Sequence, residues 1–339
     1  MNKMKIIGIG TISKLGNDVD TIWYNLNENV EVVGIDKNKF ELNIDRIKKR
    51  RMSRYSQMVV YSAMEARKDC NLVITEENTF RVGTIYTTGY GPMVSNLSFA
   101  ESLEYGDPDL CSPTIFASTV SNTCVGEVCV NLDCRGVSTL IMGSDNLEYS
   151  NMLLNKGDAD YIFTGAVEEF CEELYKYFRE NDRNVNEGVV TMVVTNTDAE
   201  SYYATYENCS GYSIQKYSYL SEEENESIVK EQVRKVIKNT LANDRVDAVI
   251  FTNSNEKIRN IELDIVKELG TDDVENVTNM SELFGDTLNV SYNLGVMLAA
   301  VSVKKGKMPA KMGNGKKVNT VLVLGTDVSG NYLAGILKR

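Results

Sequence analysis

The feature that most constrains this chain is a unit between residues 135 and 165, in which two apolar stretches flank a helical one. Propensity predicts a strand over residues 137–142, a helix that ends at Gly157, and a second strand over residues 160–165. Strand, helix and strand in this order predict an α/β protein.

The start of the helix in this unit has two interpretations. In the first, the strand is complete and Ser144 or Asp145 caps the helix; in the second, Ser138 or Thr139 caps a helix that begins earlier. A side chain at a helix start lies near free N–H groups, which favour a thiolate or an oxyanion. If the helix begins early, that side chain is Leu140, which has no such chemistry.

The rest of the chain repeats this alternation of strands and helices. The sequence predicts strands over residues 5–9, 188–196, 202–212, 246–252, 319–324 and 332–337, and helices over residues 19–26, 123–132, 222–243, 258–269 and 289–304. With 339 residues and 42% hydrophobic content, the chain can bury one large core or two joined ones.

Composition excludes several kinds of chemistry. The chain has no histidine, so it lacks both the usual general base and the commonest transition-metal ligand. Its seven cysteines form an odd set without C-x-x-C spacing, which predicts neither a disulfide framework nor a zinc site. We therefore expect no metal and no cofactor.

Charge and hydropathy limit the partners and the location. A net charge of -12 argues against nucleic acid as the main partner. No apolar run approaches the ~20 residues of a membrane span, and the first residues do not form a signal peptide, so we expect a cytoplasmic protein without a membrane partner.

Two glycine-bearing loops do not fit nucleotide sites. Residues 8–10 lack the third glycine of a dinucleotide fingerprint, and residues 81–91 lack the Gly-Lys-Ser/Thr ending of a phosphate loop.

The run from Gly136 to Glu169 resembles the nucleophile segment of the β-ketoacyl-acyl-carrier-protein synthases. Further similar segments follow the same order over nearly the whole chain, at residues 6–17, 81–91, 116–128, 279–288 and 325–331. The resemblance implies a thiolase-like fold of two similar halves in alternating α-β-α-β-α layers, with the halves at residues 1–196 and 197–339.

The resemblance also implies that the family's catalytic side chains are missing. Leu140 matches the nucleophilic cysteine, Thr252 or Asn253 the first histidine, Ser281 the lysine, and Asp286 the second histidine. For Asp286, a simple helix cap is the competing interpretation.

Four residues before the helix at residues 123–132 match the part of the family that lines the acyl tunnel and the dimer contact. They are Phe116, Thr119, Val120 and Asn122. Plain core packing is the alternative for the first three.

The basic run at residues 48–57 resembles the family's entry to a long helix. Its functional interpretation is docking of an acidic carrier protein, whereas the simpler one is a solvated face.

Three hypotheses about function follow. The first is a non-catalytic subunit of chain length factor type, which pairs with an active synthase, serves acyl carrier protein substrates and shapes the acyl tunnel. The second is an acyltransferase with another nucleophile, such as Cys124, Cys129 or Ser144. The third is a homodimeric scaffold that binds a carrier protein.

Overall fold

The computed structural model describes residues 3–28, 37–106, 111–143, 145–181, 183–214, 218, 220–242, 244–269 and 279–339. Within these residues nine strands form one sheet in the order β3-β2-β4-β5-β1-β6-β9-β8-β7. The strands are β1 (Met4–Ile12), β2 (Val82–Thr88), β3 (Ser138–Met142), β4 (Tyr161–Glu168), β5 (Gly188–Thr195), β6 (Ala204–Ser213), β7 (Ala248–Phe251), β8 (Thr320–Thr326) and β9 (Asn331–Lys338).

The sheet carries the same pairing pattern twice. From β1 outward, β5 and β4 pair antiparallel and β2 then pairs parallel. From β6 outward, β9 and β8 pair antiparallel and β7 then pairs parallel. The two series meet where β1 pairs with β6, and we propose that the halves divide at residues 1–196 and 197–339, between β5 and β6.

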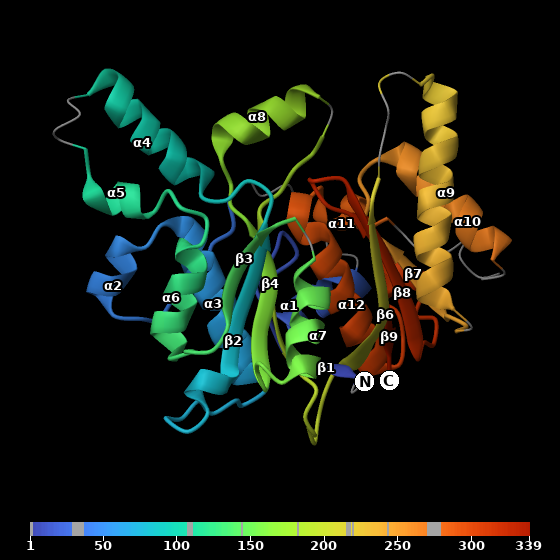
Figure 1. Cartoon of the computed structure of the whole chain (residues 1–339), viewed down its shortest axis with the longest axis horizontal. Coiled ribbons are helices and arrows are strands. Elements are labelled where there is room, and N and C mark those ends of the chain that lie inside the picture. The colour runs from blue at the N-terminus through green and yellow to red at the C-terminus, as the bar shows by residue number, and fades with distance from the viewer. Residues whose placement is uncertain are drawn as a thin grey trace.

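The helices form three layers around the two parts of the sheet (Figure 1). Helices α3 (Arg54–Asp69) and α6 (Thr123–Leu132) pack outside β1, β2 and β5. Helices α7 (Asn146–Lys156) and α12 (Ser291–Lys305) lie between the two parts, and α9 (Glu222–Leu241) and α10 (Glu256–Glu268) cover the other outer side. The architecture is the expected α-β-α-β-α layering.

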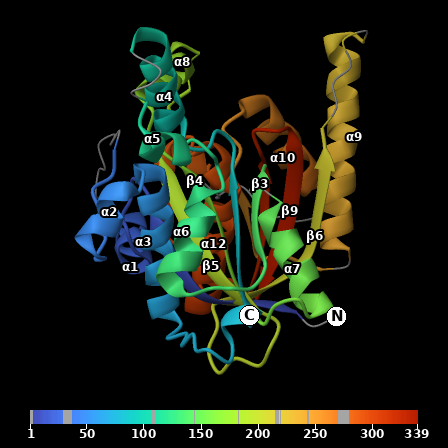
Figure 2. The same ribbon diagram turned by 60° about the vertical axis from the view of Figure 1, so that its left-hand side comes forward.

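Smaller helices complete the chain. They are α1 (Val19–Asn27), α2 (Arg46–Arg51), α4 (Met93–Tyr105), α5 (Pro113–Ala117), α8 (Glu172–Glu180), α11 (Met280–Phe284), the 3-10 helix η4 (Leu288–Val290) and α13 (Ala310–Gly313). Figures 1 and 2 show α4 and α5 standing away from the sheet at one end.

The sequences of α9 and α12 explain where each helix lies in the fold. Helix α9 is amphipathic: it buries Val229, Val233 and Val236 at helical spacing, and a capping box between Ser221 and Glu224 fixes its start. Helix α12 is apolar on all sides, and residues 291–303 are all buried, as a central helix requires.

A reciprocal amide pair joins the two central helices. The Asn146 amide nitrogen donates to the Asn293 oxygen at 3.0 Å, and the Asn293 nitrogen donates back to Asn146 at 3.1 Å. Both side chains are fully buried. Because each buried amide satisfies the other, the pair fixes how α7 and α12 lie against each other.

None of the helices in the described ranges is both long and apolar enough to cross a bilayer.

Candidate functional site

The structure decides between the two interpretations of the unit at residues 135–165. Strand β3 ends at Met142, and α7 starts at Asn146 with Asp145 at the N-cap position. The strand and helix start of the first interpretation are therefore correct, although the Asp145 side chain makes no capping hydrogen bond, and the early helix start is wrong. The run at residues 138–142 pairs parallel with β2, so its backbone groups are used in the sheet rather than in a helix.

Leu140 consequently lies in the middle of β3, opposite Tyr86 of β2, and not at a helix start. Its side chain is half-buried and packs against the outer core under α3 and α6. Leucine at this place contributes packing, and no helix dipole acts on it.

The turn after β3 is held by the opposite half of the molecule. Gly143 has a φ of +124°, and a Cβ there would lie 2.9 Å from the Asp327 carboxylate, so only glycine fits. The buried Asn289 amide donates to the Gly143 carbonyl oxygen and, at 2.9 Å, to the Thr87 hydroxyl.

A cleft of about 550 Å³ opens beside this turn. It is lined by Tyr90, Arg183, Thr252, Asn253, Ser254, Asn255, Glu256, Lys257, Asp286, Leu288, Ser291, Thr326, Asp327 and Val328. Three of the five positions that match family catalytic residues are therefore brought together here. Leu140 and Ser281 do not line the cleft.

The Asp286 side chain accepts several hydrogen bonds at the edge of the cleft. One oxygen, Oδ2, accepts from Arg183 Nε at 2.9 Å and from the Ser254 hydroxyl at 2.7 Å, while Oδ1 accepts from the Leu288 backbone N–H at 2.8 Å. The carboxylate is only 6% exposed. Asp286 does bond the backbone at the start of η4, as a cap would, but it is also the buried partner of an ion pair with Arg183, whose side chain is 40% exposed.

The two residues that match the first histidine are also occupied by internal bonds. The Thr252 hydroxyl donates to the Leu324 carbonyl oxygen at 2.9 Å. The Asn253 amide donates to Glu262 Oε1 at 2.7 Å and accepts from the Thr326 hydroxyl. Both residues are 3% exposed, so they form the wall of the cleft.

Glu262 supports this wall from behind. It lies fully buried on α10 and accepts hydrogen bonds from Asn253 and, at 2.9 Å, from the Tyr332 hydroxyl. Burial raises the pKa of Glu262 to about 7, although these hydrogen bonds oppose the shift.

Ser281 has a local structural role. It lies in the first turn of α11, where its N–H donates to the capping Asn279 side chain at 3.1 Å. The place that matches the family's lysine therefore carries a helix start outside the cleft.

The four tunnel or interface positions lie on the surface of this chain. Phe116 is 59% exposed and Val120 is 52% exposed, while Thr119 is half-buried and Asn122 is exposed. None of the four lines the cleft. Plain core packing is therefore wrong for Phe116 and Val120, and the tunnel and interface roles stay predictions.

The alternative nucleophiles differ in their surroundings. Burial raises the pKa of the Cys124 thiol to about 12, which suppresses the thiolate. Cys129 lies on α6, and its sulfur is 3.1 Å from the Thr84 hydroxyl of β2 and 3.8 Å from the Ser138 hydroxyl of β3. Ser144 lies outside the described residues.

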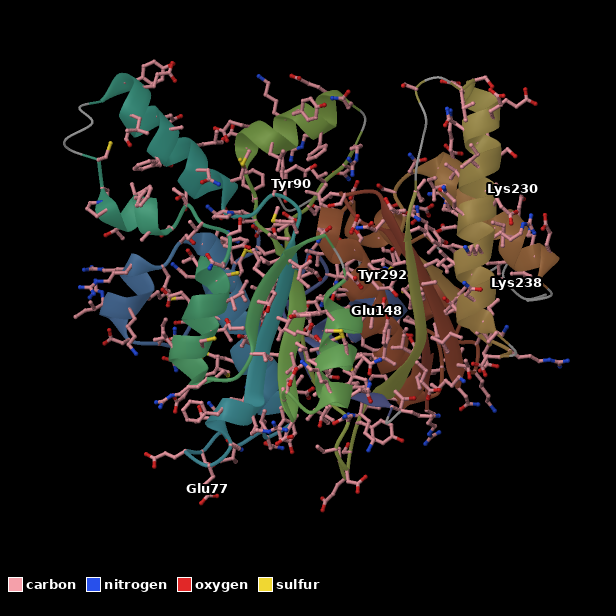
Figure 3. All side chains as sticks on the ribbon, viewed as in Figure 1. Glu77, Tyr90, Glu148, Lys230, Lys238 and Tyr292 are labelled. Carbon is pink, nitrogen blue, oxygen red and sulfur yellow. The ribbon has the colours of Figure 1, made fainter. Side chains whose placement is uncertain are left out.

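Several cleft residues were missed by sequence reasoning. Arg183 lies between α8 and β5, 103 positions before Asp286, and no motif marks it. Tyr90, labelled in Figure 3, packs edge to face on Phe178 of α8 with ring centroids 5.7 Å apart. A lone basic residue in a loop gives no sequence signal for a distant ion pair.

Comparisons with known proteins agree with this architecture. The chain is 28% identical over 191 residues to 3-oxoacyl-acyl-carrier-protein synthase 2 of Staphylococcus aureus (strain COL), and that match covers 49% of this chain and 45% of the relative. The corresponding synthase of Synechocystis is 24% identical over 191 residues. The chain thus spans about half the length of the curated relatives it matches. No family model matches the chain.

Solved structures match over the whole chain. The ishigamide ketosynthase/chain length factor has a TM-score of 0.80 at 14% identity and covers 99% of both chains. A β-ketoacyl synthase from Burkholderia phymatum STM815 has a TM-score of 0.78 at 16% identity, with both chains fully covered. A further match comes from the structure of a type II polyketide synthase acyl-carrier protein in complex with its ketosynthase. The matched chain has a TM-score of 0.78 at 15% identity, and the match covers 99% of both chains. The expected thiolase-like fold and the resemblance to β-ketoacyl synthases are confirmed.

Proposed function

We propose that this chain is a non-catalytic, ketosynthase-like subunit of chain length factor type. In this role it pairs with an active β-ketoacyl synthase during fatty acid or polyketide chain elongation and shapes the tunnel for the growing acyl chain. The observation that carries the proposal is that every position matching a family catalytic residue holds a side chain already used in packing or in internal bonds; at Ser281 the hydroxyl oxygen accepts from the Asn279 amide.

The chemistry of condensation supports this proposal. The reaction needs a thiolate to accept the acyl group and hydrogen-bond donors to stabilise the oxyanions that develop. Leu140 cannot be acylated. Around the cleft, Asp286, Glu256 and Asp327 bring three carboxylates against the cations of Arg183 and Lys257, an excess of negative charge that would repel an oxyanion.

The edge of the sheet offers a surface for a partner subunit. Strand β3 is the last strand on its side, so its outer N–H and C=O groups have no neighbouring strand in the described part of the chain. Its apolar residues are only half-buried at Leu140 and Ile141, and Met142 is 55% exposed. An apolar, unpaired edge of this kind is typically covered by another chain.

Helix α2 provides a candidate contact for an acyl carrier protein. Its basic side chains Arg46, Lys48, Arg50 and Arg51 are all exposed, on a chain whose net charge is strongly negative. Such a local basic surface suits an acidic partner, whereas a solvated face remains the simpler alternative.

Co-expression with an active β-ketoacyl synthase from the same organism tests the proposal. We expect the two chains to elute together on size-exclusion chromatography, and the synthase to elongate an acyl primer faster with this chain than alone. Met142→Lys on β3 is expected to break the complex, whereas Val73→Lys, at a residue that is 67% exposed and outside β3, is expected to keep it. Elongation by this chain alone would contradict the proposal, and elution only with itself would favour the homodimeric scaffold.

A further inference from the structure

Helices α4 and α5 form an arm that the core does not hold. No residue of either helix is buried, although Phe99 and Phe116 stack on each other with ring centroids 5.3 Å apart. Figures 1 and 2 show the arm projecting from the end of the sheet. The arm joins β2 through residues 88–94, which we call the arm base.

Two consecutive carboxyl groups at the end of β4 hold the arm base. Glu168 accepts hydrogen bonds from the backbone N–H groups of Gly89 and, at 3.3 Å, of Tyr90, and from the Thr88 hydroxyl at 3.3 Å. Glu169 accepts from the Val94 N–H at 3.0 Å, in the first turn of α4, where the N-cap residue is a proline and offers no side-chain bond.

The surroundings of these carboxyl groups disfavour their charged forms. Glu168 is 1% and Glu169 is 4% exposed. Glu169 faces the buried Glu187, and the nearby cation, Arg54, is already paired with Glu187, with Arg54 Nε 3.2 Å from Oε2.

The other titratable groups that face Glu168 and Glu169 supply no positive charge that would stabilise their ionised forms. The phenols of Tyr55, Tyr90 and Tyr175 lie around Glu168, and that of Tyr175 also faces Glu169. Burial is the main cause that raises the pKa of Glu168 to about 8 and that of Glu169 to about 7, against the opposing effect of their N–H bonds.

We propose that Glu168 and Glu169 form a proton-controlled latch on the arm, in which the protonated carboxyls keep the arm base closed and their ionisation releases it. Opening of residues 88–94 would expose both groups to water, where the ionised form is favoured. Each opening therefore releases protons, and the open population rises as the pH rises.

Release would also change the cleft. Tyr90 belongs to the arm base and lines the cleft, and a Cβ added at Gly89 would lie 2.5 Å from Val328, another lining residue. The arm base is thus packed under the loop at residues 326–331, so the position of the arm and the shape of the cleft change together.

The latch is a property of this chain alone, so its test needs no partner and is separate from the proposed function. The experiment is amide hydrogen exchange of the intact chain between pH 6 and pH 8.5, expressed as protection factors to remove the intrinsic pH dependence. For one linked proton, we expect protection at Gly89, Tyr90 and Val94 to fall by up to about tenfold per pH unit up to the pKa of the closed state.

Two substitutions locate the effect. Glu168→Gln cannot ionise, and its single amide oxygen can accept from the Gly89 N–H but not also from the Tyr90 N–H, which bonds the other oxygen in wild type. Protection at Gly89 should therefore become nearly independent of pH. Glu127→Gln is the matched control, because burial also raises the pKa of Glu127 but this residue lies on α6 away from the arm base. It should leave the wild-type pH profile unchanged.

Three results would overturn the latch. One is a protection factor at the arm base of the folded wild-type chain that does not change with pH. Another is a pH profile that stays the same as wild type in both Glu168→Gln and Glu169→Gln. The third is protection at the arm base equal to that of the core amides Ile162 and Val193 at every pH, because opening would then be global unfolding.

Discussion

Strand β3 and the cleft beside the turn that follows it hold two different kinds of residue at the positions expected to match the family's catalytic ones. In β3 this residue is Leu140, an apolar side chain that contributes packing. In the cleft, Asp286 and Asn253 are polar side chains whose bonding groups are taken up by Arg183 and Glu262.

The comparison teaches that polarity at a matched position is a poor guide to activity. A polar group must have free bonding capacity and a suitable charge before it can act on a substrate. We therefore expect substitutions in the cleft to lower the free energy of unfolding more than a substitution at Leu140 in β3. Four predictions test this difference, from the largest effect to the smallest.

The largest effect is expected from Asp286→Ala. The substitution removes the acceptor for Arg183, Ser254 and the Leu288 N–H together, so we expect a loss of about 3 to 4 kcal/mol in the free energy of unfolding. Urea unfolding at pH 7 measures it. Asp160→Ala is the matched control, because Asp160 also pairs with an arginine, Arg81, but is 39% exposed, and its loss should cost about 1 kcal/mol or less. Equal losses in the two variants would contradict the distinction.

The second prediction concerns the pH dependence of stability behind the cleft. Because the pKa of Glu262 is about 7 in the folded chain against 4.5 ordinarily, its contribution to stability is complete below about pH 4.5 and is lost as the pH rises through 7. Glu262→Gln cannot ionise. Its unfolding free energy relative to wild type should therefore rise by about 3 kcal/mol between pH 4.5 and pH 8. A constant difference across this range would show that Glu262 is not held in its neutral form.

In β3, Leu140→Ala should lower the free energy of unfolding by only about 1 to 2 kcal/mol, because the side chain is half-buried. Met142→Ala on the same strand is the control, and since Met142 is 55% exposed its loss should be about 0.5 kcal/mol or less. Thermal and urea unfolding of the two variants give these values. A loss at Leu140 as large as that at Asp286 would remove the contrast between the two regions.

The smallest effect is expected from Leu140→Cys. The new thiol would lie in a strand, with no helix start and no imidazole to activate it, so we expect no covalent loading from an acyl thioester. Intact mass after incubation reports loading, and the rate of alkylation by iodoacetamide should be that of an ordinary thiol. Rapid acylation of this variant would mean that this position in β3 supports nucleophilic chemistry.

Local signals in the sequence predicted the elements around both regions well. The strand expected over residues 137–142 is β3 within one residue, and Gly157 ends α7 in a left-handed conformation with φ of +80°. Ser221 and Glu224 form the cap expected for α9. These features depend on neighbours in the sequence, which a pattern can report.

The parts of the site that were missed depend on distant contacts. Arg183 and Glu262 reach Asp286 and Asn253 from other segments, and nothing near them in the sequence marks those partners. The arm was missed as well, because the apolar residues of α4 do not gather on one helix face. Of the residues found by counting along a family motif, Asp286 lies in the cleft, whereas Ser281 lies outside it in the first turn of α11.

The amide pair between Asn146 and Asn293 has a consequence for how the two parts of this chain can change over time. Each asparagine depends on the other, because either one alone would lose one donor and one acceptor bond of a buried amide. If recombination replaced the segment that carries α7 or the one that carries α12, the incoming segment would have to bring an asparagine at the matching position to keep the pair.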